Sequence, residues 1–366
     1  MNKKLLLFLI CFFNNAQKIS FEVPETPEVA VEPSELPEDC LVDRNGEIIT
    51  QKFSYARELK LINHHIKPLS VIAKSKHVSK IIGWAQNNTT PFSIDWRKFA
   101  TKHNINLDEC VIPESGFKTF NEFFTRKLKP GARPIDQTEQ GIVSPADSKI
   151  TYVQNVSKKD VFIIKSSKWS LAKMLDNQIL ADQYEGGTLI SFRLSPEDYH
   201  RFHFPIDATP GFSKKIPGRY DSVNPYVYKH GYDPLGENAR NILILKSEEF
   251  ENPLCIIVGA LGVGKIVETY TPHIAYKKGD EMGYFEFGAS TVCLLFKKNV
   301  VRPADDKLIS NSLKMIETEV KQGSLIALHK SASITEVLST KVQVFFSTSY
   351  RQLAEKYSQL KAFFNR

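Results

Sequence analysis

Between residues 141 and 296 the chain consists mainly of short runs rich in Val, Ile, Leu, Phe and Tyr. Runs of this length and composition are typical of strands buried in a sheet. A chain of 366 residues, 42% of them hydrophobic and 24% charged, is long enough to bury a sizeable core around such strands. We therefore predict a β-rich core over 141–305. The clearest runs are Thr188–Phe192, Asn241–Leu245, Leu254–Val258 and Thr291–Phe296.

Helical patterns flank this core, so the expected fold class is α+β. A capping-box pattern at Thr119–Glu122 begins a helix within an N-terminal helical region over 44–140, and Pro130-Gly131 would end it. An apolar stripe near the C-terminus predicts a helix within an extension over 306–366, which would dock on the body or on a partner. The first helical face carries Phe120, Phe123, Phe124 and Leu128, and the second carries Tyr350, Leu353, Tyr357, Leu360 and Phe364.

The amino terminus has the pattern of a targeting segment. Lys3-Lys4 precede nine apolar residues, Leu5–Phe13, and Ala16 is a small residue at a suitable place for cleavage. We expect residues 1–16 to be a signal peptide for entry into a secretory or organellar compartment, the alternative being a short uncleaved anchor. Residues 17–43 carry prolines among glutamates, which predicts an acidic, extended linker.

The formal net charge of +7 includes eight acidic residues between Glu22 and Asp43, so +15 remains on the rest of the chain. A body that basic attracts nucleic acid or acidic lipid head groups, although a soluble basic surface explains the charge equally well. The basic amphipathic stretch Leu69–Ala85 fits a helix lying on a membrane surface, or one packed on the core with its lysines in water.

Gly259–Lys265 matches the spacing of a phosphate-binding loop and follows an expected strand. Two features argue against a nucleotide site there. Ile266 stands where Ser or Thr would hold magnesium, and residues 267–271 continue as a strand where a helix should begin. We therefore interpret these glycines as a feature of close β packing.

A small, hydroxyl-bearing step interrupts the apolar run FEFGASTVCLLF at Phe285–Phe296. A bend at a strand edge explains it, and so does a serine placed to attack its own backbone. Two other stretches carry groups suited to chemistry: Asp147 lies in a turn at the start of the β region, and His200 and His203 lie three residues apart. No third ligand stands at a familiar spacing from the histidines, so we predict no metal site.

Several motifs, in order, make the chain resemble the phosphatidylserine decarboxylase family over roughly residues 45–305. They are Phe117–Asp136, Ser144–Asp147, Asp198–His203, Val258–Ala260, Lys278–Gly283 and Phe287–Thr291. The resemblance implies a proenzyme that cuts itself between Ala289 and Ser290 and converts Ser290 into a pyruvoyl cofactor. This group would be the electron sink for decarboxylation.

The resemblance also implies roles for the other site residues. His203 would be the base that activates the Ser290 hydroxyl, and Asp147 would orient its ring, as in the logic of a serine hydrolase triad. His200 would serve the decarboxylation step. Arg126 and Arg133 lie near the Phe-rich motif, where contact with a phosphate head group is one interpretation and a solvated helix end is the one we favour.

The sequence departs from the family pattern at three positions where glycine is usual. These are Ala289, Ser148 and Ala208. Each change adds a Cβ and removes easy access to positive φ. Because Ala289 still offers an ordinary carbonyl, we expect slower or unchanged self-cleavage rather than none.

Three functions are consistent with these sequence features. The first is decarboxylation of phosphatidylserine to phosphatidylethanolamine at a membrane surface, which the charge of the body and Leu69–Ala85 favour. The second is decarboxylation of a soluble amino acid, and the third is an uncleaved membrane-binding paralogue. The resemblance implies a homodimer of processed protomers, each holding its own two cleaved chains, and no nucleic-acid partner.

Overall fold

The structure is a computed structural model, and it describes residues 41–49, 83–90, 93–157, 161–163, 167–223, 233–260, 265–288 and 290–332. The predicted targeting segment, most of the acidic linker, most of Leu69–Ala85 and the C-terminal stripe lie outside these ranges. Within them, no helix is both long and apolar enough to cross a bilayer.

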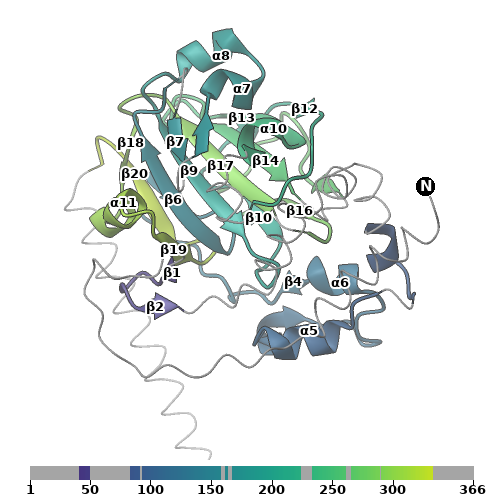
Figure 1. Cartoon of the computed structure of the whole chain (residues 1–366). Coiled ribbons are helices and arrows are strands. Elements are labelled where there is room, and N and C mark those ends of the chain that lie inside the picture. The colour runs from purple at the N-terminus through teal and green to yellow at the C-terminus, as the bar shows by residue number, and fades with distance from the viewer. Residues whose placement is uncertain are drawn as a thin grey trace, which may run out of the picture.

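A ten-stranded sheet forms the centre of the molecule, with the order β11-β13-β14-β17-β9-β6-β19-β1-β2 and with β12 also pairing with β13 (Figure 1). Most neighbours are antiparallel, and β1 pairs with β19 in parallel. The strands are β1 (Leu41–Val42), β2 (Ile48–Ile49), β6 (Ser148–Gln154), β9 (Thr188–Leu194), β11 (Thr209–Pro210), β12 (Lys214–Ile216), β13 (Arg240–Lys246), β14 (Leu254–Gly259), β17 (Ser290–Phe296) and β19 (Glu317–Val320). The predicted mainly β core and its four clearest strands are confirmed.

Hydrophobic clusters cover both faces of this sheet, which explains the long apolar runs in its central strands. In β17, Val292, Leu294 and Phe296 belong to one hydrophobic cluster, whereas Cys293 and Leu295 belong to another. Successive side chains of a strand point to opposite faces, so a strand covered on both sides needs apolar residues at every position. The second cluster includes residues of helices α7 (Leu171–Leu175) and α8 (Gln178–Gln183).

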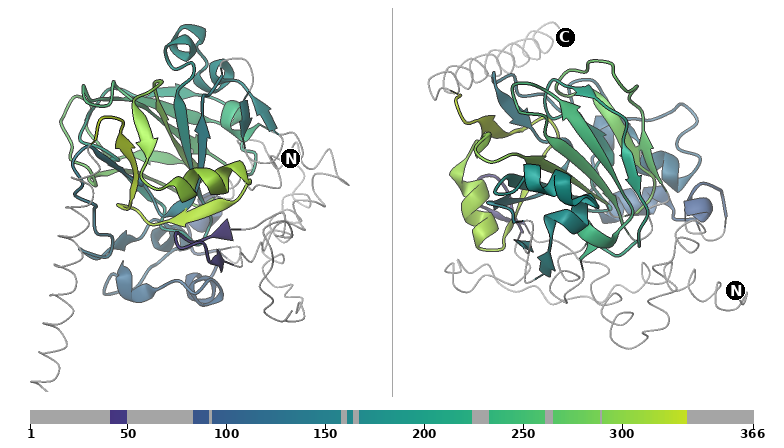
Figure 2. Two further views of the ribbon diagram at one scale, coloured as in Figure 1. Left: turned by 90° about the vertical axis from the view of Figure 1, so that its left-hand side faces the viewer. Right: turned by 90° about the horizontal axis from the view of Figure 1, so that it is seen from above.

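The first cluster lies between the central sheet and two three-stranded sheets. In the first of these sheets the strands lie in the order β10-β16-β15, and in the second they lie in the order β18-β20-β5. Helix α11 (Asp306–Leu313) contributes Leu308 to the same cluster. Figure 2 shows the arrangement of the sheets and helices from two further directions. The strands are β5 (Gly141–Val143), β10 (Arg201–His203), β15 (Ile266–Glu268), β16 (Glu281–Phe285), β18 (Val301–Pro303) and β20 (Leu325–His329).

The β core therefore continues past residue 305, where the sequence predicted the C-terminal helical extension to begin. Only α11 is helical in the described part of that extension; β19 pairs with β6, and β20 pairs with β5 and β18. At the other end, Leu41–Val42 belongs to the sheet although it was assigned to the linker. After the glycine-rich stretch, β15 begins at Ile266, as the argument against a nucleotide site required.

A small layer rich in aromatic side chains packs beside the core. Helix α5 (Trp96–Lys102) and helix α6 (Phe120–Phe124) share one hydrophobic cluster. The Thr119 hydroxyl accepts from Glu122 N at 3.1 Å, as the capping box predicts, but α6 ends at Phe124, earlier than expected. Leu128 belongs to a strand instead. The same region also contains η2 (Leu107–Glu109), β3 (Cys110–Val111) and β4 (Lys127–Leu128). The elements not yet named lie outside this layer and are β7 (Val161–Ile163), β8 (Ser167–Trp169) and α10 (Pro234–Glu237).

Candidate active site

Ser290 is the first residue of β17, in the middle of the central sheet. It pairs with Leu194 of β9 on one side and with Gly259 of β14 on the other. Its side chain is fully buried, and its Oγ has no hydrogen-bond partner among the described residues. A buried hydroxyl without a partner is costly, and such groups often have a chemical role. Ala289 lies outside the described residues.

The backbone bends just before this strand. Gly288 has φ of 140°, a conformation that residues with a Cβ rarely adopt. Glycine at this position therefore lets the chain turn into β17 immediately ahead of the Ala289-Ser290 bond. Neither Ser148 nor Ala208 has a positive φ. The expected backbone cost of those two departures from glycine is thus absent.

His200 is completely buried beside α6, with its ring centroid 3.9 Å from that of Phe124. Its Nδ1 lies 2.9 Å from the backbone oxygen of Asp198, which can only accept, so Nδ1 carries the proton. Its Nε2 is then an acceptor, and it has no partner in the described part of the chain. Burial lowers the pKa of His200 to about 3, so the ring is neutral at physiological pH.

His203 lies at the end of β10, where the pairing with β16 shifts register. Its Nδ1 contacts the Gly279 oxygen at 2.9 Å, and its Nε2 contacts the Tyr199 hydroxyl at 3.2 Å. The Nδ1–H tautomer again leaves Nε2 as a basic nitrogen, here accepting from Tyr199. Burial lowers the pKa of His203 below its ordinary value, more than the Gly279 bond and Glu281 raise it.

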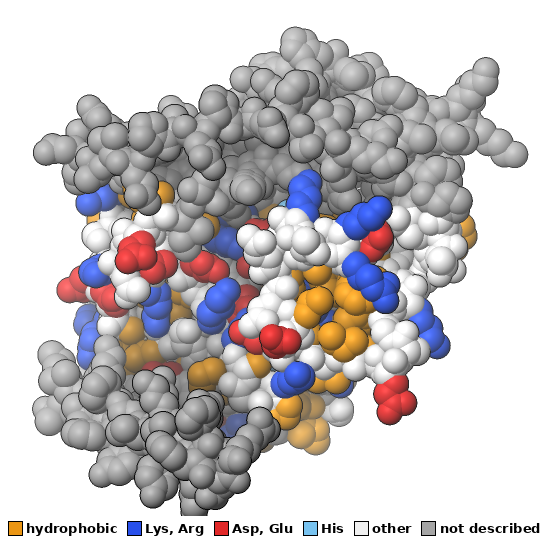
Figure 3. All heavy atoms as spheres, turned by 90° about the horizontal axis from the view of Figure 1, so that it is seen from below, with side chains coloured by type: hydrophobic (Ala, Val, Ile, Leu, Met, Phe, Trp, Pro, Cys, Tyr) orange, Lys and Arg blue, Asp and Glu red, His pale blue; other side chains and the backbone are white. Residues whose placement is uncertain are grey.

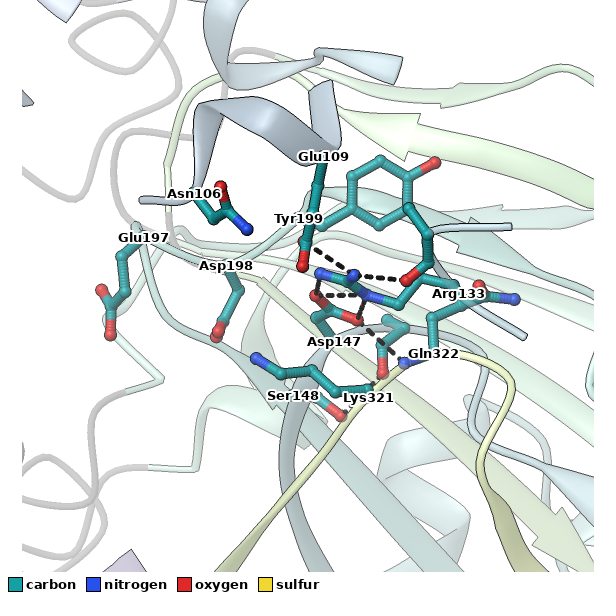
Figure 4. A network of polar contacts seen from close by, with 12 residues as sticks. Asn106, Glu109, Arg133, Asp147, Ser148, Glu197, Asp198, Tyr199, Lys321 and Gln322 are labelled. Atoms are coloured by element: carbon teal, nitrogen blue, oxygen red, sulfur yellow. Dashed lines mark hydrogen bonds and ion pairs between the residues drawn. The ribbon is translucent and has the colours of Figure 1, made fainter. Parts of the chain in front are cut away.

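Asp147 does not hydrogen-bond to His203, contrary to the triad predicted from the resemblance. Both of its oxygens accept from Arg133, at 2.7–3.1 Å, and its Oδ1 also accepts from Gln322 N at 2.8 Å (Figure 4). Arg133 in turn donates to Glu109 of η2 at 2.8 Å. The charge of Asp147 still favours protonation of His203, but the ring is oriented by Tyr199 and Gly279.

A cavity of about 410 Å³ opens beside this network. Its walls come from the aromatic layer and from the turns ahead of β6 and β10. Figure 3 shows the face seen from below, where lysine and arginine side chains lie among aspartate and glutamate side chains. The charged residues lining the cavity are Lys102, Glu109, Arg126, Arg133, Asp147, Lys149, Glu197, Asp198, Glu319 and Lys321.

Sequence reasoning missed the partners of the predicted residues. Arg126 and Arg133 are not solvated: Arg126 is 5% exposed, and Arg133 is bound on both sides by carboxylates. Tyr199, the hydrogen-bond donor to His203, lies inside the Asp198–His203 motif, and its hydroxyl directly before His200 was a signal that could have identified it. Glu109 carried no sequence signal, because its role depends on a contact with Arg133 across 24 residues.

A buried serine hydroxyl without a partner at the head of a strand, and two histidines that each keep Nε2 as an acceptor, are groups that suit an autocatalytic proenzyme. The comparisons with known proteins specify which. The family model of phosphatidylserine decarboxylase matches residues 120–328, and the chain belongs to that family.

Curated relatives agree along most of the chain. A phosphatidylserine decarboxylase proenzyme of Chlamydia pneumoniae is 41% identical over 259 residues, which cover 70% of this chain and 85% of the relative. The proenzyme of Fusobacterium nucleatum is 39% identical over 292 residues, which cover 79% of this chain and 96% of the relative. The proenzyme of Ruminiclostridium cellulolyticum is 41% identical over 228 residues, which cover 62% of this chain and 76% of the relative.

Proposed function

We propose that this chain is a phosphatidylserine decarboxylase proenzyme, which cuts itself at Ala289-Ser290 and then converts phosphatidylserine to phosphatidylethanolamine and carbon dioxide. Membership of the family supports the reaction. The observation that carries self-cleavage is the buried, unpartnered Oγ of Ser290 at the start of β17, directly after the bend at Gly288.

The cleavage reaction follows from the position of this hydroxyl. Ser290 Oγ loses its proton to a histidine and attacks the carbonyl carbon of Ala289, and the peptide C–N bond breaks as an ester forms. Loss of the Cα proton of Ser290 then expels the Ala289 carboxylate and leaves dehydroalanine. Its enamine tautomerises to an imine, and water releases ammonia to leave a ketone.

The surroundings fit the group so formed, because Ser290 is enclosed and a polar oxygen there has no competing partner among the described residues. The pyruvoyl group, made from Ser290, supplies the electron sink for decarboxylation. His203, with a basic Nε2 held by Tyr199, is the base for cleavage. His200, neutral and with a free Nε2 in the described structure, serves to hold or return a proton during decarboxylation.

Intact-mass measurement after denaturing electrophoresis tests self-cleavage. Active protein should yield a larger chain ending at Ala289 and a smaller chain of residues 290–366 whose first residue has lost its amine. A Ser290→Ala variant should stay uncleaved. A single full-length wild-type chain that keeps serine at position 290 would show an uncleaved paralogue.

Release of carbon dioxide tests the substrate. We expect release from vesicles containing phosphatidylserine and none from free serine or tryptophan. The two histidine roles are separated by variants. His203→Ala should block cleavage, whereas His200→Ala should permit cleavage and block decarboxylation; the reverse pattern would exchange the two assignments.

A membrane surface and a homodimer of processed protomers complete the proposal. The basic stretch Leu69–Ala85 and the lipid substrate support membrane association, and the pattern in residues 1–16 supports entry into a secretory or organellar compartment. Co-sedimentation of the full chain with acidic vesicles, compared with neutral ones, measures the first of these.

A further inference from the structure

Arg126 is a buried cation on the wall of the cavity. It follows the last turn of α6, is 5% exposed, and holds its guanidinium 4.9 Å from the ring centroid of Phe123. A buried guanidinium is costly unless it is paired and fully hydrogen-bonded. The partners of Arg126 are therefore informative.

Three other cations in this region are paired with carboxylates. Arg133 binds Asp147 at 2.7 Å, Lys149 of β6 binds Asp198 at 2.6 Å, and Arg193 of β9 binds Glu317 of β19 at 2.5 Å. No carboxylate among the described residues lies within ion-pairing distance of Arg126. Arg126 is thus a buried cation on the cavity wall that, within the described chain, makes no ion-pair contact with a carboxylate, although Asp147 and Asp198 act on its charge from a greater distance.

The hydrogen bonds of Arg126 are long and incomplete. Its terminal nitrogens donate to the backbone oxygens of Phe123, Glu197 and Asp198 at 3.3–3.4 Å, its Nε has no partner in the described structure, and the thiol of Cys110 lies beside it. Arg240 shows what a purely structural arginine looks like. It is also buried, and it donates to three backbone oxygens at 2.7–2.8 Å.

We propose that Arg126 is an oxyanion-binding residue of the cavity and takes the phosphate or the carboxylate of a serine phospholipid head group. A guanidinium binds either oxyanion through two parallel hydrogen bonds. The cavity volume of about 410 Å³ suits a head group.

The position of Arg126 links this site to the reaction. The backbone oxygen of Asp198 accepts both from Arg126 and from His200 Nδ1. The anion site is thus joined to the histidine assigned to decarboxylation through one shared backbone oxygen. The inference rests on the proposed function for the identity of the lipid, but the anion site itself does not.

Binding to the full-length Ser290→Ala proenzyme tests the inference without any catalysis. Titration calorimetry would use three soluble probes: glycerophosphoserine, glycerophosphoethanolamine and free serine. We expect Arg126→Met to weaken the binding of glycerophosphoserine by roughly 10- to 100-fold, the effect of losing a charge-assisted pair. Arg97→Met is the matched control, because Arg97 is an exposed arginine of the same layer and does not line the cavity.

The probes distinguish the two anions. Binding of glycerophosphoethanolamine that depends on Arg126 identifies the phosphate, and binding of free serine that depends on it identifies the carboxylate. Equal affinities in the parent and in Arg126→Met, or no binding of any probe by the parent, would overturn the inference. Should Arg126→Met unfold, Arg126→Lys keeps the charge without the fork, and an unchanged affinity there would overturn it as well.

The proposed function fails separately. If the wild-type enzyme releases no carbon dioxide from phosphatidylserine vesicles while the probes still bind through Arg126, the reaction is wrong and the anion site stands. If carbon dioxide is released and KM for a short-chain phosphatidylserine is the same in wild type and Arg126→Lys, the reaction stands and the anion site is wrong.

Discussion

At the scale of single residues, the site is organised by groups that touch the predicted residues more than by contacts among them. Asp147 is held by Arg133 and a backbone N–H, and His203 by Tyr199 and a carbonyl. The acidic and basic partners are therefore fixed before any cleavage takes place. Fixed partners are what a reaction without a diffusing substrate requires, since both reacting atoms already belong to one chain.

Removing Arg133 should cost both stability and cleavage. Arg133→Gln leaves the Asp147 carboxylate, with a side chain 4% exposed, buried without its main partner. We expect the free energy of unfolding to fall by about 3 kcal/mol and self-cleavage to slow. Urea unfolding of the variants in a Ser290→Ala background measures the first, and a time course of chain cutting measures the second.

The control for this variant is Lys214→Gln, which breaks the exposed pair with Asp176 and should change stability by only ~0.5 kcal/mol. An Arg133→Gln protein as stable as the control and cut at the wild-type rate would show that the clamp on Asp147 has no role.

The pH dependence of cleavage should reflect the burial of His203. The base must be neutral to accept the serine proton, and burial lowers its pKa although Glu281 and Asp147 raise it and Arg201 lowers it further. Cleavage should therefore stay fast as the pH falls to about 6.5, the ordinary histidine pKa, and decline only below it. Cutting of freshly translated precursor across a pH series checks this; a decline centred above pH 6.5 would exclude His203 in this state as the base.

At the scale of elements, the sequence predicted what depends on local pattern. β9, β14 and β17 are buried at every position and β13 at most positions, so all four carry long apolar runs, and composition reveals such strands directly. By contrast, β19 reads Glu-Thr-Glu-Val, and its place in the sheet depends on pairing with β6 and on Glu317 meeting Arg193. Those contacts lie far away in sequence, so no local pattern could have shown them.

The site divides in the same way. Motifs identified Ser290, His200, His203 and Asp147, but not which atoms face one another, because rotamers and hydrogen bonds depend on residues elsewhere in the chain. The early end of α6 was also missed. The helical spacing of Leu128 was accidental, since Lys127–Leu128 pairs with Cys110–Val111 as a strand.

The bend ahead of β17 should control the rate of cutting. Gly288→Ala adds a Cβ at φ of 140°, so the chain must shift exactly where the scissile bond begins, and we expect cleavage to slow at least several-fold. Ala289→Gly restores the residue usual in the family and should leave the rate unchanged or raise it. Gly211→Ala is the control, because its φ is not positive and its Cβ would meet no atom within 4 Å.

The aromatic layer should contribute strongly to stability. Phe123 is fully buried and its ring lies 5.5 Å from Trp96 and 5.6 Å from Phe117. Phe123→Ala should lower the free energy of unfolding by roughly 3–5 kcal/mol, the usual cost of such a cavity. Phe212→Ala, at a side chain 77% exposed, is the control and should have little effect in the same thermal or urea unfolding experiment.

At the scale of the whole molecule, the aromatic layer and the β core meet at the site. Glu109 of η2 binds Arg133, which binds Asp147 at the start of β6, and Phe124 of α6 packs on His200. A change in this layer is therefore transmitted to two of the predicted site residues through direct contacts. The stretch that precedes it in sequence is the one with the basic amphipathic pattern.

The place of β17 between β14 and β9 has one more consequence. The fragment that begins at Ser290 supplies an interior strand of the sheet. It also supplies β19, which pairs with β1 and β6, and β20, which pairs with β5, and these partners all precede the cleavage site. Cleavage would thus cut the polypeptide but leave the folded molecule in one piece. The two fragments would co-elute in any separation under native conditions, and the new amino terminus would stay paired between β14 and β9.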